Sequence, residues 1–168
     1  VKATNHDEVT PKEKHVRTIL AATTGSSATR QDIAYTIGAL AKRLKGNGWL
    51  VTLKVLMVVH RILKEGGGPF LEVFGSSSSG SSQLLNLHNF KDESNPDTWD
   101  LSAWIRGYSL YIEERVAVAQ QLSFDAARGA KPQERFRSLE ATSLLAEMPA
   151  LQQLLHRLLG CDPEGAAT

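Results

Sequence analysis

Residues 49–64 read WLVTLKVLMVVHRILK and form the most apolar stretch of the chain. The valines alone would allow a buried strand, but about 16 residues is long for a strand. A helix with this sequence is apolar on nearly every side, which is typical of the centre of a bundle or a solenoid. Lys54, His60 and Arg61 interrupt the run, which is also shorter than the roughly 20 residues that span a bilayer. We therefore expect a buried central helix, and any membrane contact should be peripheral.

Two amphipathic helices are expected before this central run. Thr10-Pro11-Lys12-Glu13 has the form of a capping box, and Thr29 to Asp32 repeats the start signal. Apolar residues at helical spacing follow the two starts: Val16, Ile19 and Leu20 in the first helix, and Ile33, Ile37, Leu40, Ala41 and Leu44 in the second.

Glycine, serine and proline divide the chain after the central run. Gly66-Gly67-Gly68 follows a helix and lacks the lysine of a phosphate-binding loop, so we interpret it as a helix stop. Pro149 lies inside a helical pattern and predicts a kink or a break. The expected elements are a short helix over 69–74, a flexible Gly/Ser loop over 75–83, a polar loop over 91–100, a long helix over 101–122 and a last helical region over 144–159.

The composition limits the possible classes of protein. A chain of 168 residues fits one domain, and no alternating strand pattern appears, so the sequence predicts an all-α bundle or right-handed superhelical solenoid. A net charge of +1 argues against a nucleic-acid binder that works through bulk charge. The single cysteine, Cys161, excludes an internal disulfide framework and fits a reducing cytosol.

Signals for an enzyme are poor. The five histidines show no metal-ligand spacing, and His60 is better explained as a hydrogen-bonded core residue. Cys161 has no activating base nearby in the sequence. Glu113-Glu114-Arg115 fits a solvated helix face better than an acid/base pair, and the three tryptophans fit packing roles.

One basic cluster has two possible explanations. Lys12, Lys14 and His15 crowd the first turns of an expected helix, where the helix dipole disfavours cations. Either these side chains are simply solvated, or they face a bound anion together with free backbone N–H groups. The residues alone leave both readings open, with solvation slightly favoured.

The stretch KATNHDEVTPKEKH, residues 2–15, resembles the phosphoinositide-binding motif of ANTH domains, the domain of clathrin assembly proteins. That motif is a lysine, nine residues, a lysine, any residue, Lys or Arg, then His or Tyr, and it places Lys2, Lys12, Lys14 and His15 in the site. Further segments resemble the family in the same order along the chain: NGWLVTLKVLMVVHRIL, GGGPFLEVF, LLNLHNFKDES, DLSAWIRGYSLYIEERV and LLAEMPALQQLLHRLL.

The resemblance implies a non-enzymatic module of an endocytic clathrin adaptor that binds phosphatidylinositol 4,5-bisphosphate and supports coat assembly. It implies no cofactor and no metal. Its location would be cytoplasmic and peripheral to the membrane, at clathrin-coated pits and vesicles of the plasma membrane, with the Golgi left open. Clathrin and other adaptors would bind regions outside this chain, which we expect to be a monomer in solution. The alternative is a helical interaction module that sorts SNARE cargo without a specific lipid site.

The sequence departs from the family pattern at several points. The first helix and the C-terminal helices of the ANTH domain are expected to be missing, so that residues 1–168 form the N-terminal to middle portion of a single domain. Glu13 stands where some relatives carry a third lysine, which could weaken lipid binding. The long Gly/Ser loop is typical of a plant-type branch of the family.

Overall fold

The computed structural model of the chain describes residues 2–24, 27–46, 48–66, 68–78, 85–128 and 132–162. These residues form helices and no strand, so the prediction of an all-α fold is confirmed. The helices are α1 (Glu13–Thr24), α2 (Arg30–Leu44), α3 (Trp49–Glu65), α4 (Gly68–Ser78), α5 (Thr98–Gln121), α6 (Pro132–Ser138) and α7 (Ala141–Leu159).

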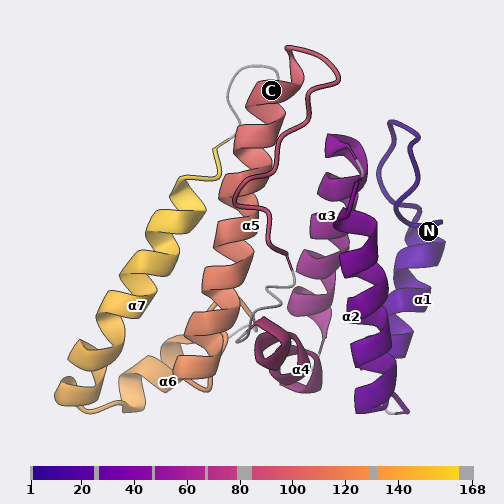
Figure 1. Cartoon of the computed structure of the whole chain (residues 1–168). Coiled ribbons are helices and arrows are strands. Elements are labelled where there is room, and N and C mark those ends of the chain that lie inside the picture. Colours follow the sequence, from indigo (N-terminus) through magenta and orange to yellow (C-terminus); the bar gives the residue numbers. More distant parts are fainter. Residues whose placement is uncertain are drawn as a thin grey trace.

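The central position of α3 agrees with its apolar sequence. It packs against α1 and α2 on one side and α5 on the other, while α4 crosses the ends of its neighbours (Figure 1). Val51, Val55 and Ile62 of α3 are fully buried. From α1 to α5, helices that follow one another in the chain also pack against one another, and α7 packs against α5, so the molecule is a helical solenoid.

Helix α2 begins at the capping box that its sequence predicts. The Thr29 hydroxyl accepts a hydrogen bond from the Asp32 backbone N–H, and the Asp32 carboxylate accepts one from the Thr29 N–H, both at 3.1 Å. This reciprocal capping box leaves Ile33 and Ile37 facing the core, where both are buried.

Helix α4 is longer than predicted. Residues 75–78, expected in a flexible Gly/Ser loop, belong to α4, and residues 79–84 lie outside the described part of the chain. Gly75 packs closely against α5: a methyl group on it would lie 1.9 Å from the side-chain amide nitrogen of Gln120, and this exposed side chain would have to move. Contact with α5 thus outweighs the low helix propensity of glycine.

The polar stretch expected as a loop over 91–100 is also partly helical. Helix α5 already begins at Thr98, whose buried hydroxyl donates to the carbonyls of Asp92 and Asn95. These bonds anchor the polar turn against the first residue of the helix.

Helix α7 packs against α5 and is continuous through Pro149, so of the predicted kink or break the break is wrong. Pro149 is exposed, and it has no N–H group to donate to the carbonyl four residues earlier in the helix. The short helix α6, which the sequence did not predict, is tied to α7 by an ion pair between Arg135 and Glu147. Leu145 and Leu159 on the outer side of α7 are 66% and 70% exposed.

Candidate functional site

The basic cluster lies at the N-terminal end of α1. The Lys12 carbonyl accepts hydrogen bonds from the N–H groups of His15 and Val16, at 2.9 and 3.3 Å, and so closes the first turn. Val16 is buried, as expected from its apolar side chain, and this fixes which side of α1 faces the core. As a consequence Lys12 and Lys14 are exposed, while His15 is half-buried.

Glu13 does not take part in the capping box that was predicted for Thr10 and Glu13. Its carboxylate instead pairs with Arg61 of α3 at 3.2 Å and with Arg17 of α1 at 3.1 Å. Arg61 has a second partner, Glu65, at 2.5 Å. Hydrogen bonds from Arg61 first, and from Arg17 second, lower the pKa of Glu13.

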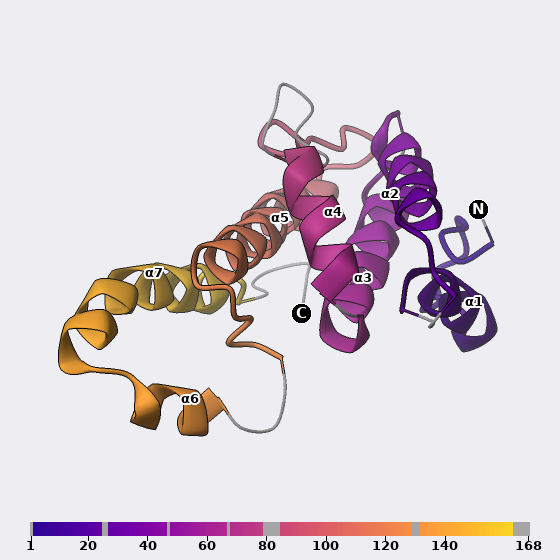
Figure 2. The same ribbon diagram turned by 90° about the horizontal axis from the view of Figure 1, so that it is seen from below.

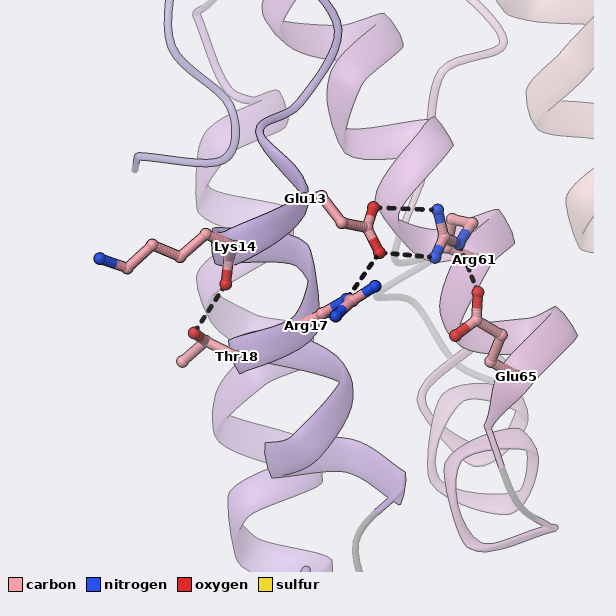
Figure 3. Close-up of polar contacts among 6 residues, drawn as sticks. All are labelled: Glu13, Lys14, Arg17, Thr18, Arg61 and Glu65. Atoms are coloured by element: carbon pink, nitrogen blue, oxygen red, sulfur yellow. Dashed lines mark hydrogen bonds and ion pairs between the residues drawn. The ribbon is translucent and has the colours of Figure 1, made fainter.

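The two neighbours Glu13 and Lys14 point in different directions (Figure 3). Glu13 points toward Arg61, and the side chain of Lys14 extends away from α3. The negative charge between Lys12 and Lys14 in sequence is therefore compensated by guanidinium groups on the other side of the helix. Glu13 does not compete with an anion for Lys14.

Residues 2–12 lead into α1, and two basic side chains of the helical stack hold them. Arg43 of α2 donates to the Thr4 hydroxyl and carbonyl, at 3.2 and 2.6 Å. Lys54 of α3 donates to the carbonyl oxygens of Asn5 and Asp7 and to the side-chain oxygen of Asn5. The segment is thus bonded to the fold immediately after Lys2.

A cavity of about 260 Å³ separates this segment from the start of α3. Glu8, Val9 and Thr10 form one wall, and Trp49, Leu53 and Met57 lie in the opposite wall. The cavity is open to solvent, and Glu8, Val9 and Thr10 are themselves exposed.

The four residues of the predicted site lie either at the start of α1 or in the segment that precedes it. Lys2, Lys12 and Lys14 are exposed, and their ammonium groups have no hydrogen-bond or ion-pair partner among the residues that the structure describes. Lys14 and His15 lie in the first turn of α1, Lys12 directly precedes that helix, and Lys2 lies at the start of the segment. These cations are free to meet an anion from solution or from a surface.

Sequence reasoning missed the residues that support the cluster. Lys54 and Arg61 were noted only as interruptions of an apolar run, yet both bind residues of the N-terminal part. Arg43 and Arg17 gave no distinguishing signal. A charged residue inside an otherwise apolar helix was the one usable clue, because burial there requires a partner.

His60 and Tyr108 form a hydrogen bond of 2.7 Å between Nδ1 and the hydroxyl, so the prediction of a hydrogen-bonded His60 is confirmed. Burial lowers the pKa of His60 and raises the pKa of Tyr108 to about 12. A tyrosine hydroxyl with that pKa stays protonated near neutrality, so the pair has the character of a structural contact.

Two other expectations are wrong. Arg115, expected on a solvated face, is buried and paired with Asp125 at 2.7 Å. Trp99, expected to pack, is 61% exposed and lies beneath Lys91, whose ammonium is 5.7 Å from the ring centre. The residue types alone did not reveal that Arg115 would pair with Asp125, or that Trp99 would lie beneath Lys91.

Within the described ranges, no group of histidine, cysteine and carboxylate side chains could hold a metal ion. None of the described helices is both long enough and apolar enough to cross a membrane.

The described part of the chain is thus an all-helical solenoid with exposed lysines at the start of α1 and in the segment before it. The chain belongs to the ANTH domain family, whose family model, described as "ANTH domain", matches residues 1–168. This confirms the resemblance seen in the sequence.

Relatives with known names support the same assignment. Two proteins of Arabidopsis thaliana that carry the name "Putative clathrin assembly protein" are each 47% identical to this chain, over 177 and 176 residues. The alignments cover 99% of this chain and 31% and 29% of those proteins. Human "Clathrin coat assembly protein AP180" is 33% identical over 162 residues, which are 96% of this chain and 17% of the human protein. The chain therefore spans less than a third of the length of these relatives.

Proposed function

We propose that this chain is the membrane-binding module of an endocytic clathrin adaptor and that it holds the headgroup of phosphatidylinositol 4,5-bisphosphate. Lys2, Lys12, Lys14 and His15 are the proposed ligands. The observation that carries the proposal is that the three lysines are exposed and unpaired among the described residues, while Glu13 is engaged by arginines.

The chemistry of the cluster suits a phosphorylated ring. The lysine ammonium groups meet phosphate oxygens, and the His15 ring donates a further hydrogen bond. The N-terminus of α1 adds its dipole, which favours an anion at the same place where it disfavours the lysines. A bound headgroup thereby offsets the unfavourable interaction between the lysines and the dipole of α1.

The expected affinity of one module is low. Each basic side chain near an anionic surface contributes about 1 kcal/mol, so three or four contribute roughly 3–4 kcal/mol, which corresponds to millimolar binding. A multiply charged headgroup improves on that value. Several modules on one coat would increase the overall affinity by orders of magnitude, which suits a non-enzymatic adaptor.

The assembly role is proposed from the names of the relatives. Those names assign clathrin assembly to proteins more than three times as long as the matched region. Clathrin and other adaptors would bind parts of such a protein that lie outside this chain. Sorting of SNARE cargo remains a prediction, to which no described residue is assigned.

Sedimentation with vesicles tests the lipid site. The unmodified chain should bind vesicles that contain the bisphosphate lipid and bind weakly to vesicles that contain phosphatidylserine at equal surface charge. Lys12→Glu combined with Lys14→Glu should abolish the preference and leave the helical circular dichroism unchanged, because both side chains are exposed.

The matched control places the same charge change elsewhere. Lys42 and Lys64 are exposed lysines of α2 and α3, and Lys42→Glu combined with Lys64→Glu should retain the lipid preference. Equal losses in the two double variants would mean that a diffuse field, rather than this cluster, attracts the membrane.

A further inference from the structure

Lys54 is a buried cation on the most apolar helix of the molecule. Only 2% of the residue is exposed, and it ranks among the largest buried side chains. Within the described part of the chain, its ammonium group forms no ion pair. Three oxygens accept its hydrogen bonds: the Asn5 carbonyl at 3.1 Å, the Asn5 side-chain oxygen at 2.8 Å and the Asp7 carbonyl.

These three contacts use the full donor capacity of the ammonium group. A lysine has three N–H donors and no acceptor, and burial of a charge is costly unless it is hydrogen-bonded. All three acceptors belong to the segment before α1, and none belongs to a helix. The charge of Lys54 is therefore satisfied only while residues 5–7 lie against α3.

The surrounding contacts extend this attachment toward Lys2. Ala3 and Thr4 are buried, and Arg43 of α2 holds Thr4 through its hydroxyl and carbonyl. Residues 3–7 are thus fastened to two helices, and the backbone of Lys2 leaves the fold at a fixed place.

We infer that Lys54 is a positioning residue of the anionic headgroup site: it fastens residues 5–7 and thereby holds Lys2 in place relative to the first turn of α1. This inference rests on the proposed function. A segment that was not fastened would have to be ordered on binding, and that entropic cost would cancel the contribution of Lys2.

A double-mutant cycle in vesicle binding tests the coupling between Lys2 and Lys54. In the unmodified chain, Lys2→Ala should weaken binding to bisphosphate vesicles about fivefold, the effect of one basic side chain near an anionic surface. In the Lys54→Met background the same change should weaken binding by a clearly smaller factor, because residues 5–7 are released and Arg43 alone still holds the chain next to Lys2, at Thr4. Loss of fold stability alone would not change the dependence on Lys2.

The matched control removes another lysine from the same helix. Lys64→Met also deletes one positive charge from α3, but Lys64 is exposed, so the fivefold effect of Lys2→Ala should persist. A second variant, Asn5→Ala, leaves α3 unchanged and removes one of the three acceptors. It should also reduce the Lys2 effect, even if Lys54→Met does not fold.

The outcomes separate this inference from the proposed function. A fivefold Lys2 effect that persists with Lys54→Met and Asn5→Ala would overturn the positioning role alone. Equal binding of the unmodified chain to bisphosphate and phosphatidylserine vesicles would overturn the lipid site before Lys54 is changed. Limited proteolysis gives a readout without lipid: a glutamate-specific protease should cleave after the exposed Glu8 faster in Lys54→Met than in the unmodified chain, and an unchanged rate would contradict the inference.

Discussion

At the scale of single residues, the ion pair between Arg115 and Asp125 determines how the end of α5 is fixed. Arg115 is 2% exposed and donates to both carboxylate oxygens of Asp125, at 3.2 and 2.7 Å, and to the Leu63 carbonyl at 3.3 Å. Asp125 also accepts from the Ala127 N–H. One guanidinium thus joins α5, the end of α3 and the turn after α5.

Removal of one partner of this pair should destabilise the protein strongly. Asp125→Asn leaves Arg115 buried without its counter-charge, and the free energy of unfolding should fall by about 3 kcal/mol. Urea denaturation followed by circular dichroism measures the change. Asp162→Asn, at an exposed position, should change it by less than about 0.5 kcal/mol. Similar values for the two variants would show that the buried pair adds no stability.

At the scale of helices, α3 is capped from a distant part of the chain. The Asp92 carboxylate accepts hydrogen bonds from the backbone N–H groups of Trp49, at 2.7 Å, and Ser94, at 2.9 Å. Gly48 makes room for it, since a methyl group at Gly48 would lie 2.8 Å from the Asp92 oxygen. The loop before α5 and the start of α3 are therefore joined by one carboxylate.

The Asp92 cap should make the stability of the protein depend on pH in the acidic range. Hydrogen bonds from Ser94 first, and then from the Trp49 backbone, hold the pKa of Asp92 below its ordinary value of 3.8. Because the folded-state pKa is the lower one, the stabilisation is fully present above 3.8 and is lost as pH falls through the folded-state value. Asp92→Asn should cost about 1 kcal/mol at pH 7 and progressively less in acid. Thermal unfolding of both proteins from pH 7 to pH 2 measures this difference, and a constant difference would exclude the carboxylate as the cause.

The helices that local sequence could predict are those whose determinants are local. The Thr29 capping box and the apolar faces of α2, α3 and α5 are read from neighbouring residues, and the structure contains them. Helix α4 extends through Gly75, which packs beside Gln120 of α5, 45 positions away in the sequence. Helix α7 continues through Pro149 while it packs against α5, and neighbouring residues do not reveal either contact.

The same limit applies to the candidate site. The motif located Lys2, Lys12, Lys14 and His15 from their spacing. It could not reveal that Glu13 is paired with Arg61, because 48 positions separate the two residues. The attachment of Asn5 to Lys54, over 49 positions, was hidden for the same reason. Sequence thus indicated the ligands, and tertiary structure supplied their supports.

At the scale of the whole molecule, two chemically different surfaces lie far apart. The helices succeed one another from α1 on one side to α7 on the other, and both views agree on this order (Figures 1 and 2). The lysine cluster belongs to the α1 side, and the exposed leucines Leu145 and Leu159 belong to the α7 side. A membrane held by the lysines would therefore touch α1 first, and contact with these leucines on α7 would be a separate contact.

Neutral substitutions on α7 test which side meets the membrane. Leu145→Gln combined with Leu159→Gln should leave binding to bisphosphate vesicles unchanged, and stability should change little because both side chains are mostly exposed. Vesicle sedimentation beside the Lys12→Glu and Lys14→Glu double variant makes the comparison. A loss in the leucine variant as large as that in the lysine variant would place the membrane contact on α7.

The cavity between residues 8–10 and α3 gives the molecule a natural optical reporter. Trp49 forms part of its wall, opposite Val9, so the fluorescence of this indole is sensitive to displacement of the segment. Trp99 is already open to solvent, and its emission can be quenched by iodide. Displacement of residues 8–10, such as the release expected in Lys54→Met, can thus be followed without a chemical label.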